Sequence, residues 1–189
     1  MKKILVVIDM QNDFTTGPLG NKECAAVIPE VISVMQNTEY NRIIFTKDTH
    51  QDNYLQTQEG KRLPVPHCME GTKGWEIVPS IVAAAEGTVT EVIHKPTFGS
   101  VALGETLKKY SESMIKTQRN ADHKTEDAEV EIDFCGVCTG ICVISNVMIA
   151  KAFVPEARIC VIEKACACVT PQSHQTAIEA MKTCQVDMI

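Results

Sequence analysis

Short apolar runs alternate with longer segments of helical spacing along the chain. The runs are rich in β-branched residues and predict strands at 3–9, 42–48, 88–95, 128–136, 157–165 and 184–189. Apolar residues three and four apart predict helices at 24–37, 76–87, 139–153 and 171–184. Apolar strands that alternate with helices are typical of a parallel sheet covered on both faces. The pattern therefore predicts an α/β fold, a three-layer αβα sandwich around a mostly parallel sheet of about six strands.

Two polar stretches interrupt this alternation. The segment 49–75 is a long loop with Gly and Pro, and long loops in compact domains often carry function. The segment 110–129 is charged, and we interpret it as a surface insertion without chemistry. No linker composition and no internal repeat divides the chain, so residues 1–189 are expected to form a single domain.

Charge and composition exclude several classes of protein. With a net charge of −6, the chain is not expected to bind nucleic acid or an anionic membrane. The first apolar run is short and two aspartates follow it at once, unlike in a signal peptide, and no stretch reaches the ~18 apolar residues of a membrane-spanning helix. Nine cysteines, an odd number, fit a cytoplasmic protein with reduced thiols. Most are interpreted as small buried residues: Cys24, Cys160, Cys166, Cys168 and Cys184.

Polar or nucleophilic residues stand where the predicted strands end. In open parallel sheets, chemistry gathers in the crevice beyond the carboxyl ends of the strands. Asp9 closes the first strand, Asp48 the second and Lys95 the third, and a cysteine-rich turn follows the fourth. We therefore expect these residues to meet at one edge of the sheet.

The cysteine-rich turn, CGVCTGICV, admits three interpretations. A structural zinc site would need further ligands at close spacing, and none follows. A redox pair of Cys135 and Cys138 has the CxxC spacing, but its first cysteine would end a strand rather than open a helix. A nucleophile at Cys142 would lie where a helix begins, and free N–H groups there favour a thiolate and can hold an oxyanion. Asp9 and Lys95 can supply the base and the cation that a thiol nucleophile needs.

A second group of residues has the composition of a metal site. Asp48 and His50, with one residue between them, can point the same way from an extended segment, and His67 can join them from the long loop. Two imidazoles and a carboxylate suit zinc, iron or manganese. Residues of this kind at strand ends also serve simply as hydrogen-bond partners, so spacing alone leaves both alternatives open.

Three motifs in order resemble a known family. VVIDMQNDF (6–14), HKPTFGS (94–100) and GVCTGICV (136–143) are similar to segments of the isochorismatase-like cysteine hydrolases, most closely the nicotinamidase-like members. The resemblance implies a catalytic triad of Asp9, Lys95 and Cys142. It also implies a cis peptide bond between Val137 and Cys138, which would aim the backbone N–H groups of Cys138 and Cys142 at the substrate oxygen.

The resemblance further implies a reaction and a cofactor. A nicotinamidase converts nicotinamide to nicotinate and ammonia through a thioester. In such enzymes Asp48, His50 and His67 would bind a divalent metal, zinc first and iron or manganese as alternatives, and the metal would hold the pyridine nitrogen. Family members commonly form dimers or tetramers, so a homo-oligomer is expected.

The substrate pocket is less well defined by the sequence. Phe14, Tyr54 and Trp75 are candidates to line it. Nicotinamidases often have an aromatic residue where this chain has Pro64, which favours another small amide, such as a carbamoyl or ureido compound. A more distant alternative is a non-enzymatic thiol redox or metal-binding protein.

Overall fold

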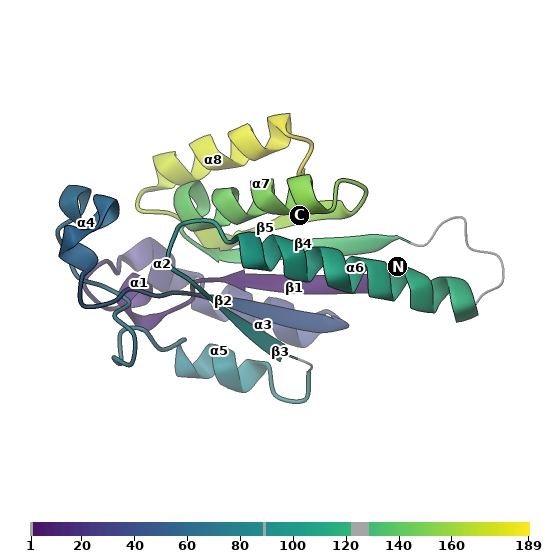
Figure 1. Ribbon diagram of the computed structural model, residues 1–189, viewed down its shortest axis with the longest axis horizontal. Coiled ribbons are helices and arrows are strands. Elements are labelled where there is room, and N and C mark those ends of the chain that lie inside the picture. The colour runs from purple at the N-terminus through teal and green to yellow at the C-terminus, as the bar shows by residue number, and fades with distance from the viewer. Residues whose placement is uncertain (1, 89, 122–128) are drawn as a thin grey trace.

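The computed structural model (Figure 1) describes residues 2–88, 90–121 and 129–189. Its strands form one sheet in the order β3-β2-β1-β4-β5-β6, and every neighbouring pair is parallel. The strand bounds are Lys2–Ile8 for β1, Arg42–Asp48 for β2, Thr90–Lys95 for β3, Val130–Val137 for β4, Arg158–Ala167 for β5 and Asp187–Met188 for β6. The predicted α/β sandwich is confirmed, and its sheet is wholly parallel.

Helices cover both faces of the sheet, as Figure 1 shows: α3 and α5 lie on one side, and α6, α7 and α8 lie on the other. The chain adds β2 and β3 on one side of β1 and then adds β4, β5 and β6 on the other side. Because crossovers between parallel strands are right-handed, this reversal of direction places the helices of the two halves on opposite faces of the sheet. The longer helices are α3 (Ile28–Asn37), α6 (Val101–Ala121), α7 (Ile144–Phe153) and α8 (Pro171–Thr183). The shorter ones are α1 (Asn12–Thr15), α2 (Lys22–Ala26), η1 (Tyr54–Gln56), α4 (Gln58–Arg62), α5 (Pro79–Ala84) and the π-helical η2 (Thr139–Val143).

The central strands are apolar because helices enclose them. Ile4 to Ile8 of β1 have no exposed surface, and the facing residues of β4 are equally buried. At about 25 cal/mol per Å² of apolar surface, burial of this kind is the main source of stability. The strands at the centre therefore form a rigid base for the residues that follow them.

The helix predicted at 24–37 is two helices. α2 ends at Ala26, and α3 begins at Ile28 after the junction residue Val27. Pro29 explains the break, because its missing N–H and fixed φ are tolerated in the first turn of a helix but not in its interior. The helix predicted at 139–153 likewise begins with a separate π-helical turn before α7.

Helix α6 was not predicted from the apolar pattern. Its charged side chains obscure the spacing of Leu103 and Leu107, which are fully buried. Residues 110–121 of the expected surface insertion form the second half of this helix, whereas 122–128 lie outside the described residues. Within the described ranges, no helix is long and apolar enough to cross a membrane.

Candidate active site and metal centre

The strand order explains how residues far apart in the sequence meet. β3, β2, β1 and β4 are neighbours, and the last residues of β2 and β3, Asp48 and Lys95, are register partners. Asp9 follows β1, and Cys138 follows β4. The strand ends that carry Asp9, Asp48, Lys95 and the cysteine-rich turn therefore lie together at the carboxyl edge of the sheet, as predicted.

The Lys95 ammonium is the centre of this group. It lies 2.6 Å from Oδ2 of Asp9, 3.3 Å from Oδ1 of Asp48 and 3.6 Å from Sγ of Cys142. It also donates to the carbonyl of Thr97 at 3.2 Å. Lys95 is only 1% exposed, and a buried lysine is tolerated only where such partners compensate its charge. The structure thus brings Asp9, Lys95 and Cys142 together.

Asp9 is held in place from two sides. Its backbone has φ of 47°, in the left-handed region that few non-glycine residues adopt. The Thr46 hydroxyl donates to Oδ1 of Asp9 at 2.6 Å, and the Asp9 N–H donates back to the same hydroxyl at 3.1 Å. These contacts leave Oδ2 directed at Lys95.

Burial and charge set the protonation of the group. Burial, together with the negative charge of Asp9, raises the pKa of the Cys142 thiol well above its usual range, although Lys95 opposes this. Burial lowers the pKa of a lysine, but Asp9, Cys142 and Asp48 outweigh it and raise the pKa of Lys95. Burial and Asp9 therefore oppose the thiolate that the helix N-terminus and Lys95 favour. The thiol needs a base to become a nucleophile.

The turn that carries Cys142 begins with a close backbone contact at Gly136 and continues as a π-helical turn. Gly136 has φ of 115°, and a Cβ there would lie 2.1 Å from the carbonyl oxygen of Ile8, so only glycine fits. The Val137–Cys138 peptide bond is cis, as the resemblance implied. The Cys138 carbonyl accepts from the N–H groups of Ile141 and Val143 rather than from that of Cys142. This turn is π-helical, a form frequently found at functional sites.

Asn146 fixes the turn to the neighbouring loop, and the sequence analysis missed it. Its amide nitrogen donates to the carbonyls of Cys142 (2.8 Å) and Phe98 (3.0 Å). Its amide oxygen accepts from the Ser100 N–H at 2.9 Å. Asn146 is fully buried and lies in α7, one turn after Cys142, and its apolar neighbours in the sequence give no sign of these hydrogen bonds.

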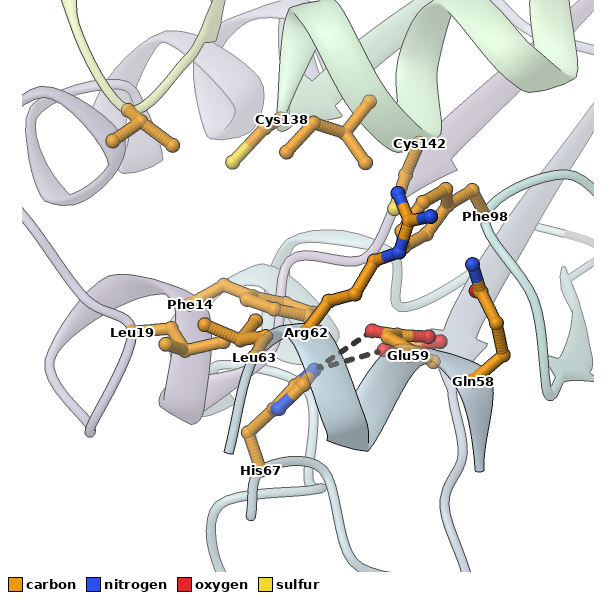
Figure 2. Close-up of a pocket in the computed structure, with 13 residues that line it drawn as sticks. Phe14, Leu19, Gln58, Glu59, Arg62, Leu63, His67, Phe98, Cys138 and Cys142 are labelled. Atoms are coloured by element: carbon orange, nitrogen blue, oxygen red, sulfur yellow. Dashed lines mark ion pairs between the residues drawn. The ribbon is translucent and has the colours of Figure 1, made fainter. Parts of the chain in front are cut away.

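Asp48, His50 and His67 form a compact cluster with a fourth member, Glu59. One ligand atom from each lies within 4.8 Å of those of the others. Oδ2 of Asp48 is 3.0 Å from Nε2 of His50 and 3.5 Å from Nε2 of His67. Oε1 of Glu59 is 3.8 Å and 3.7 Å from the same two nitrogens, and Figure 2 shows Glu59 facing His67. The sequence analysis missed Glu59 because a lone glutamate in a polar loop has no distinguishing neighbour.

The donor set fits a divalent metal. Nε2 of His50 is buried and lies 3.0 Å from Oδ2 of Asp48, but it forms no well-aligned hydrogen bond among the described residues, so a metal would satisfy it. Nδ1 of His67 lies 2.8 Å from the Val65 carbonyl, and donation to that carbonyl would leave Nε2 free to ligate. Burial raises the pKa of a carboxyl, but the two imidazoles and Lys95 outweigh it and hold the pKa of Asp48 well below its usual range. Nitrogen and oxygen donors in this number suit zinc, iron or manganese.

Gln11 orients this cluster and was also missed. Its amide nitrogen donates to the carbonyls of Asp48 and Trp75, both at 2.9 Å, and its amide oxygen accepts from the Asp48 N–H at 2.8 Å. Asp13 accepts from the Cys68 N–H at 2.7 Å and so fixes the residue after His67. Gln11 and Asp13 belong to the segment 6–14, which also carries Asp9. The polar residues of this segment therefore position the backbone of Asp48 and of the residue after His67.

A cavity of about 460 Å³ opens onto both groups. This volume suits a small molecule. The cavity is lined by Phe14, Leu19, Asp48, Gln58, Glu59, Arg62, Leu63, His67, Phe98, Cys138, Ile141, Cys142 and Val169. Figure 2 shows α4 on one side of the cavity and the cysteine-bearing turn on the other. The Cys142 thiol and the cluster of Asp48, His50, Glu59 and His67 thus adjoin the same mostly apolar cavity.

Of the three predicted pocket residues, only Phe14 lines this cavity. Tyr54 is buried behind the histidines, with its ring 4.6 Å from that of His50, and its hydroxyl donates to the Leu63 carbonyl. The Trp75 ring instead meets the His94 ring in an edge-to-face contact, with centroids 5.1 Å apart. Neither ring faces this cavity, because Tyr54 packs within the long loop and Trp75 packs against Lys47 and His94 of the neighbouring strands.

The cysteines do not pair as the redox alternative required. Cys135 is fully buried within β4, whereas Cys138 follows that strand and lines the cavity. All nine cysteines are free. The geometry therefore does not bring Cys135 and Cys138 together as a redox pair.

Comparison with known proteins places the chain in a family. The pattern of the isochorismatase domain matches residues 3–189. The chain belongs to the isochorismatase family. This isochorismatase-family hydrolase is similar to the nicotinamidase/pyrazinamidase of Mycobacterium tuberculosis, with 25% identity over 195 residues that cover 99% of this chain and 98% of that protein.

Solved structures share the fold of this isochorismatase-family chain. The pyrazinamidase of Pyrococcus horikoshii in complex with zinc has a TM-score of 0.73 and 22% identity, over 100% of this chain and 99% of that one. PnC1 from L. infantum in complex with nicotinate has a TM-score of 0.77 and 19% identity, over 100% of this chain and 92% of that one. The resemblance inferred from the three motifs is confirmed at the level of the family.

Proposed function

We propose that this chain is a cysteine amidohydrolase that releases ammonia from a small pyridine carboxamide, most simply nicotinamide. One observation carries the proposal: the Lys95 ammonium contacts Asp9, Asp48 and Cys142 at once, and so joins a base and a thiol to a metal-type cluster. The similarity to nicotinamidases supports the choice of substrate. The cytoplasmic location and the homo-oligomeric state remain predictions.

In the proposed mechanism, Asp9 takes the proton from the Cys142 thiol. Lys95 stays protonated and compensates the negative charge as it moves from the carboxylate to the sulfur. The thiolate then attacks the amide carbonyl carbon. The backbone N–H groups of Cys138 and Cys142 hold the oxyanion that forms, and one such donor is typically worth about 3 kcal/mol.

The remaining steps return the site to its starting state. Collapse of the tetrahedral intermediate breaks the carbon–nitrogen bond, and Asp9 gives its proton to the departing ammonia. A thioester on Cys142 remains. Asp9 then takes a proton from water, the hydroxide attacks the thioester, and the acid leaves as Cys142 regains its proton. Each turnover consumes one amide and one water and yields one acid and one ammonia.

Asp48, His50 and His67 would hold the metal, with Glu59 beside them. When bound, the ion supplies a Lewis-acid contact for the pyridine nitrogen of the substrate. Phe14 lies against His67, with ring centroids 5.5 Å apart, and would pack on the pyridine ring. Holding the ring at this end of the cavity presents the amide to Cys142 and converts binding into proximity.

Metal binding can be tested without an activity assay. Protein stripped with a chelator is expected to bind one zinc ion and to melt at a higher temperature with zinc than without it, because a ligand of the folded state stabilises it. His67→Ala should lose this gain. His94→Ala is the matched control, since His94 contacts the Trp75 ring edge to face and lies outside the cluster. Equal zinc stabilisation of His67→Ala and the parent protein would contradict the assigned ligands.

The substrate class is tested by ammonia release from nicotinamide and from benzamide. The two amides have the same shape, and only nicotinamide has a ring nitrogen. We expect kcat/KM for nicotinamide to be at least about 100-fold higher, because a site built for a polar atom discriminates strongly against an analogue without it. No ammonia release from nicotinamide by folded, zinc-loaded protein would refute the proposal. Equal rates for both amides would refute the role of the ring nitrogen.

A second candidate substrate is a carbamoyl or ureido compound that bears a carboxylate. Arg62 favours it, because this exposed side chain lines the cavity and forms no salt bridge within the described part of the chain. Figure 2 shows Arg62 extending from α4 toward Phe98 and Cys142. Pro64 is exposed and does not line the cavity, so no aromatic ring is supplied from that position. Ammonia release from an N-carbamoyl amino acid in the same assay would favour this candidate.

A further inference from the structure

The turn that carries Cys142 is tied to α8 by a contact that the proposed mechanism does not use. The Thr139 hydroxyl and Nδ1 of His174 form a hydrogen bond across 2.8 Å. Thr139 is the first residue of η2 and has no exposed surface, whereas His174 lies near the start of α8 and is half-buried. A buried hydroxyl needs a hydrogen-bond partner, and His174 supplies one to Thr139.

The start of α8 holds His174 in place. Thr170 and Ser173 form a capping box, in which each side chain accepts from the backbone N–H of the other residue at 3.1 Å. The His174 N–H donates to the Thr170 carbonyl at 3.0 Å. Reciprocal caps of this kind satisfy the free N–H groups of a helix start. The His174 imidazole is therefore presented to Thr139 from a fixed helix end.

Gly140 allows α8 to approach the turn closely. A Cβ at this position would lie 3.4 Å from both the Cys168 sulfur and the Ser173 carbonyl oxygen, and 3.6 Å from Cβ of Ala177. These are van der Waals distances, so any side chain longer than that of alanine would push α8 away from η2, with which it is in contact. The glycine thus keeps the Thr139 hydroxyl and the His174 ring within hydrogen-bond distance.

The turn is therefore anchored from two sides. Asn146 ties the carbonyl of Cys142 to the loop at Phe98, and the Thr139–His174 bond ties the start of the turn to α8. The two proposed oxyanion donors adjoin these anchors, because Cys138 directly precedes Thr139 and the other donor is the N–H of Cys142 itself. We propose that His174 is a positioning residue of the hydrolysis, which holds these two donors in place through the Thr139 hydroxyl. This inference rests on the proposed function.

Loss of the Thr139–His174 bond should slow the chemical step and leave substrate binding nearly unchanged. The donors act on the oxyanion, which exists only after the thiolate has attacked. The cluster around Asp48, which would hold the ring, takes no part in the contact. Because a shift of about 1 Å in an active site can cost about 100-fold in rate, we expect His174→Ala to lower kcat for nicotinamide at least about tenfold, with KM within about twofold.

Rescue by a conservative variant separates positioning from mere packing. His174→Asn keeps a polar atom at the position of Nδ1 and should restore kcat to within about threefold of the parent, whereas His174→Gln places its amide one carbon further out and should not. Gln175→Ala is the matched control, because the exposed Gln175 is the next residue of α8 and pairs with Glu179. It should keep the parent kcat.

A double variant tests whether His174 acts through Thr139. Thr139→Val and His174→Ala remove the same hydrogen bond, so the losses in kcat should not add when the two are combined. Additive losses would overturn the inference. A kcat for His174→Ala within about twofold of the parent would also overturn it, and so would equal rescue by His174→Asn and His174→Gln.

A binding measurement separates failure of this inference from failure of the proposed function. Pyridine-3-carboxaldehyde adds the Cys142 thiol: a sulfur–carbon bond forms, and the carbonyl oxygen takes the thiol proton and occupies the place of the oxyanion. We expect its Kd to rise at least about tenfold in His174→Ala and to stay unchanged in Gln175→Ala, because the adduct resembles the transition state.

Each outcome of the aldehyde titration has one meaning. If the parent binds the aldehyde but releases no ammonia from nicotinamide, the proposed function is refuted, and the Kd values still decide the role of His174. If nicotinamide is hydrolysed and the aldehyde binds His174→Ala as tightly as the parent, the proposed function stands and the role of His174 is overturned. If the parent neither binds the aldehyde nor hydrolyses nicotinamide, both are refuted.

Discussion

Replacement of Cys142 by alanine is expected to lower kcat by at least about 10⁴-fold, with little change in the melting temperature. Nucleophiles that act as a unit with a base lose nearly all of their rate enhancement when the attacking atom is removed. The Cys142 sulfur accepts a hydrogen bond from the Lys95 ammonium, with nitrogen and sulfur 3.6 Å apart. The measurement is ammonia release under single-turnover conditions, with the folded state checked by circular dichroism.

The matched control is Cys166→Ala. Cys166 is equally buried but lies in β5 and contacts the Phe134 carbonyl rather than the site. It should retain activity within about twofold and lose roughly 1 kcal/mol of stability, because a small cavity is created. If Cys142→Ala kept more than a hundredth of the parent rate, Cys142 could not be the nucleophile.

Replacement of Lys95 by methionine should affect both rate and stability. The buried Asp9 and Asp48 carboxylates would lose the cation that lies 2.6 Å and 3.3 Å from them. Removal of one partner from a buried ion pair typically costs about 3–5 kcal/mol. We expect the melting temperature to fall by roughly 10 °C in a chain of this size, and kcat to fall at least about 10³-fold.

Lys47→Met is the control for the loss of a lysine. Lys47 is the residue before Asp48, so its side chain leaves β2 on the opposite face, where its ammonium lies over the Trp75 ring. This variant should lose about 1 kcal/mol or less and keep its activity. Thermal melts and initial rates of both variants check the prediction. Equal losses in the two variants would show that Lys95 has no special role.

The sheet and the catalytic group were accessible from the sequence for one physical reason. Buried parallel strands are rich in apolar residues, so their ends are visible as the polar residues that close each run. Asp9, Asp48 and Lys95 were found in this way before any family was considered. Their neighbourhood then followed from the rule that strand ends of one parallel sheet lie at one edge.

The residues that were missed act through tertiary contacts with no local signature. Glu59 reaches the histidines from the short helix α4, and Asn146 lies among apolar residues that give no hint of its three hydrogen bonds. Helix α6 was concealed because charged residues outnumber the leucines that anchor it. Tyr54 and Trp75 lie outside the cavity because the path of a long loop is set by tertiary contacts, such as that of Trp75 with His94, which periodicity does not encode.

Asn146 limits how a new substrate preference can arise. One amide ties the segment that carries Phe98 to the helix that carries Cys142, so these two walls of the cavity behave as one part. A 96–100 segment transplanted from a relative would leave a buried amide unsatisfied unless its backbone followed the same path. The opposite wall has no such restriction at Arg62, whose side chain is exposed. Directed evolution toward other amides should therefore accumulate changes on α4 and leave the Phe98 wall as it is.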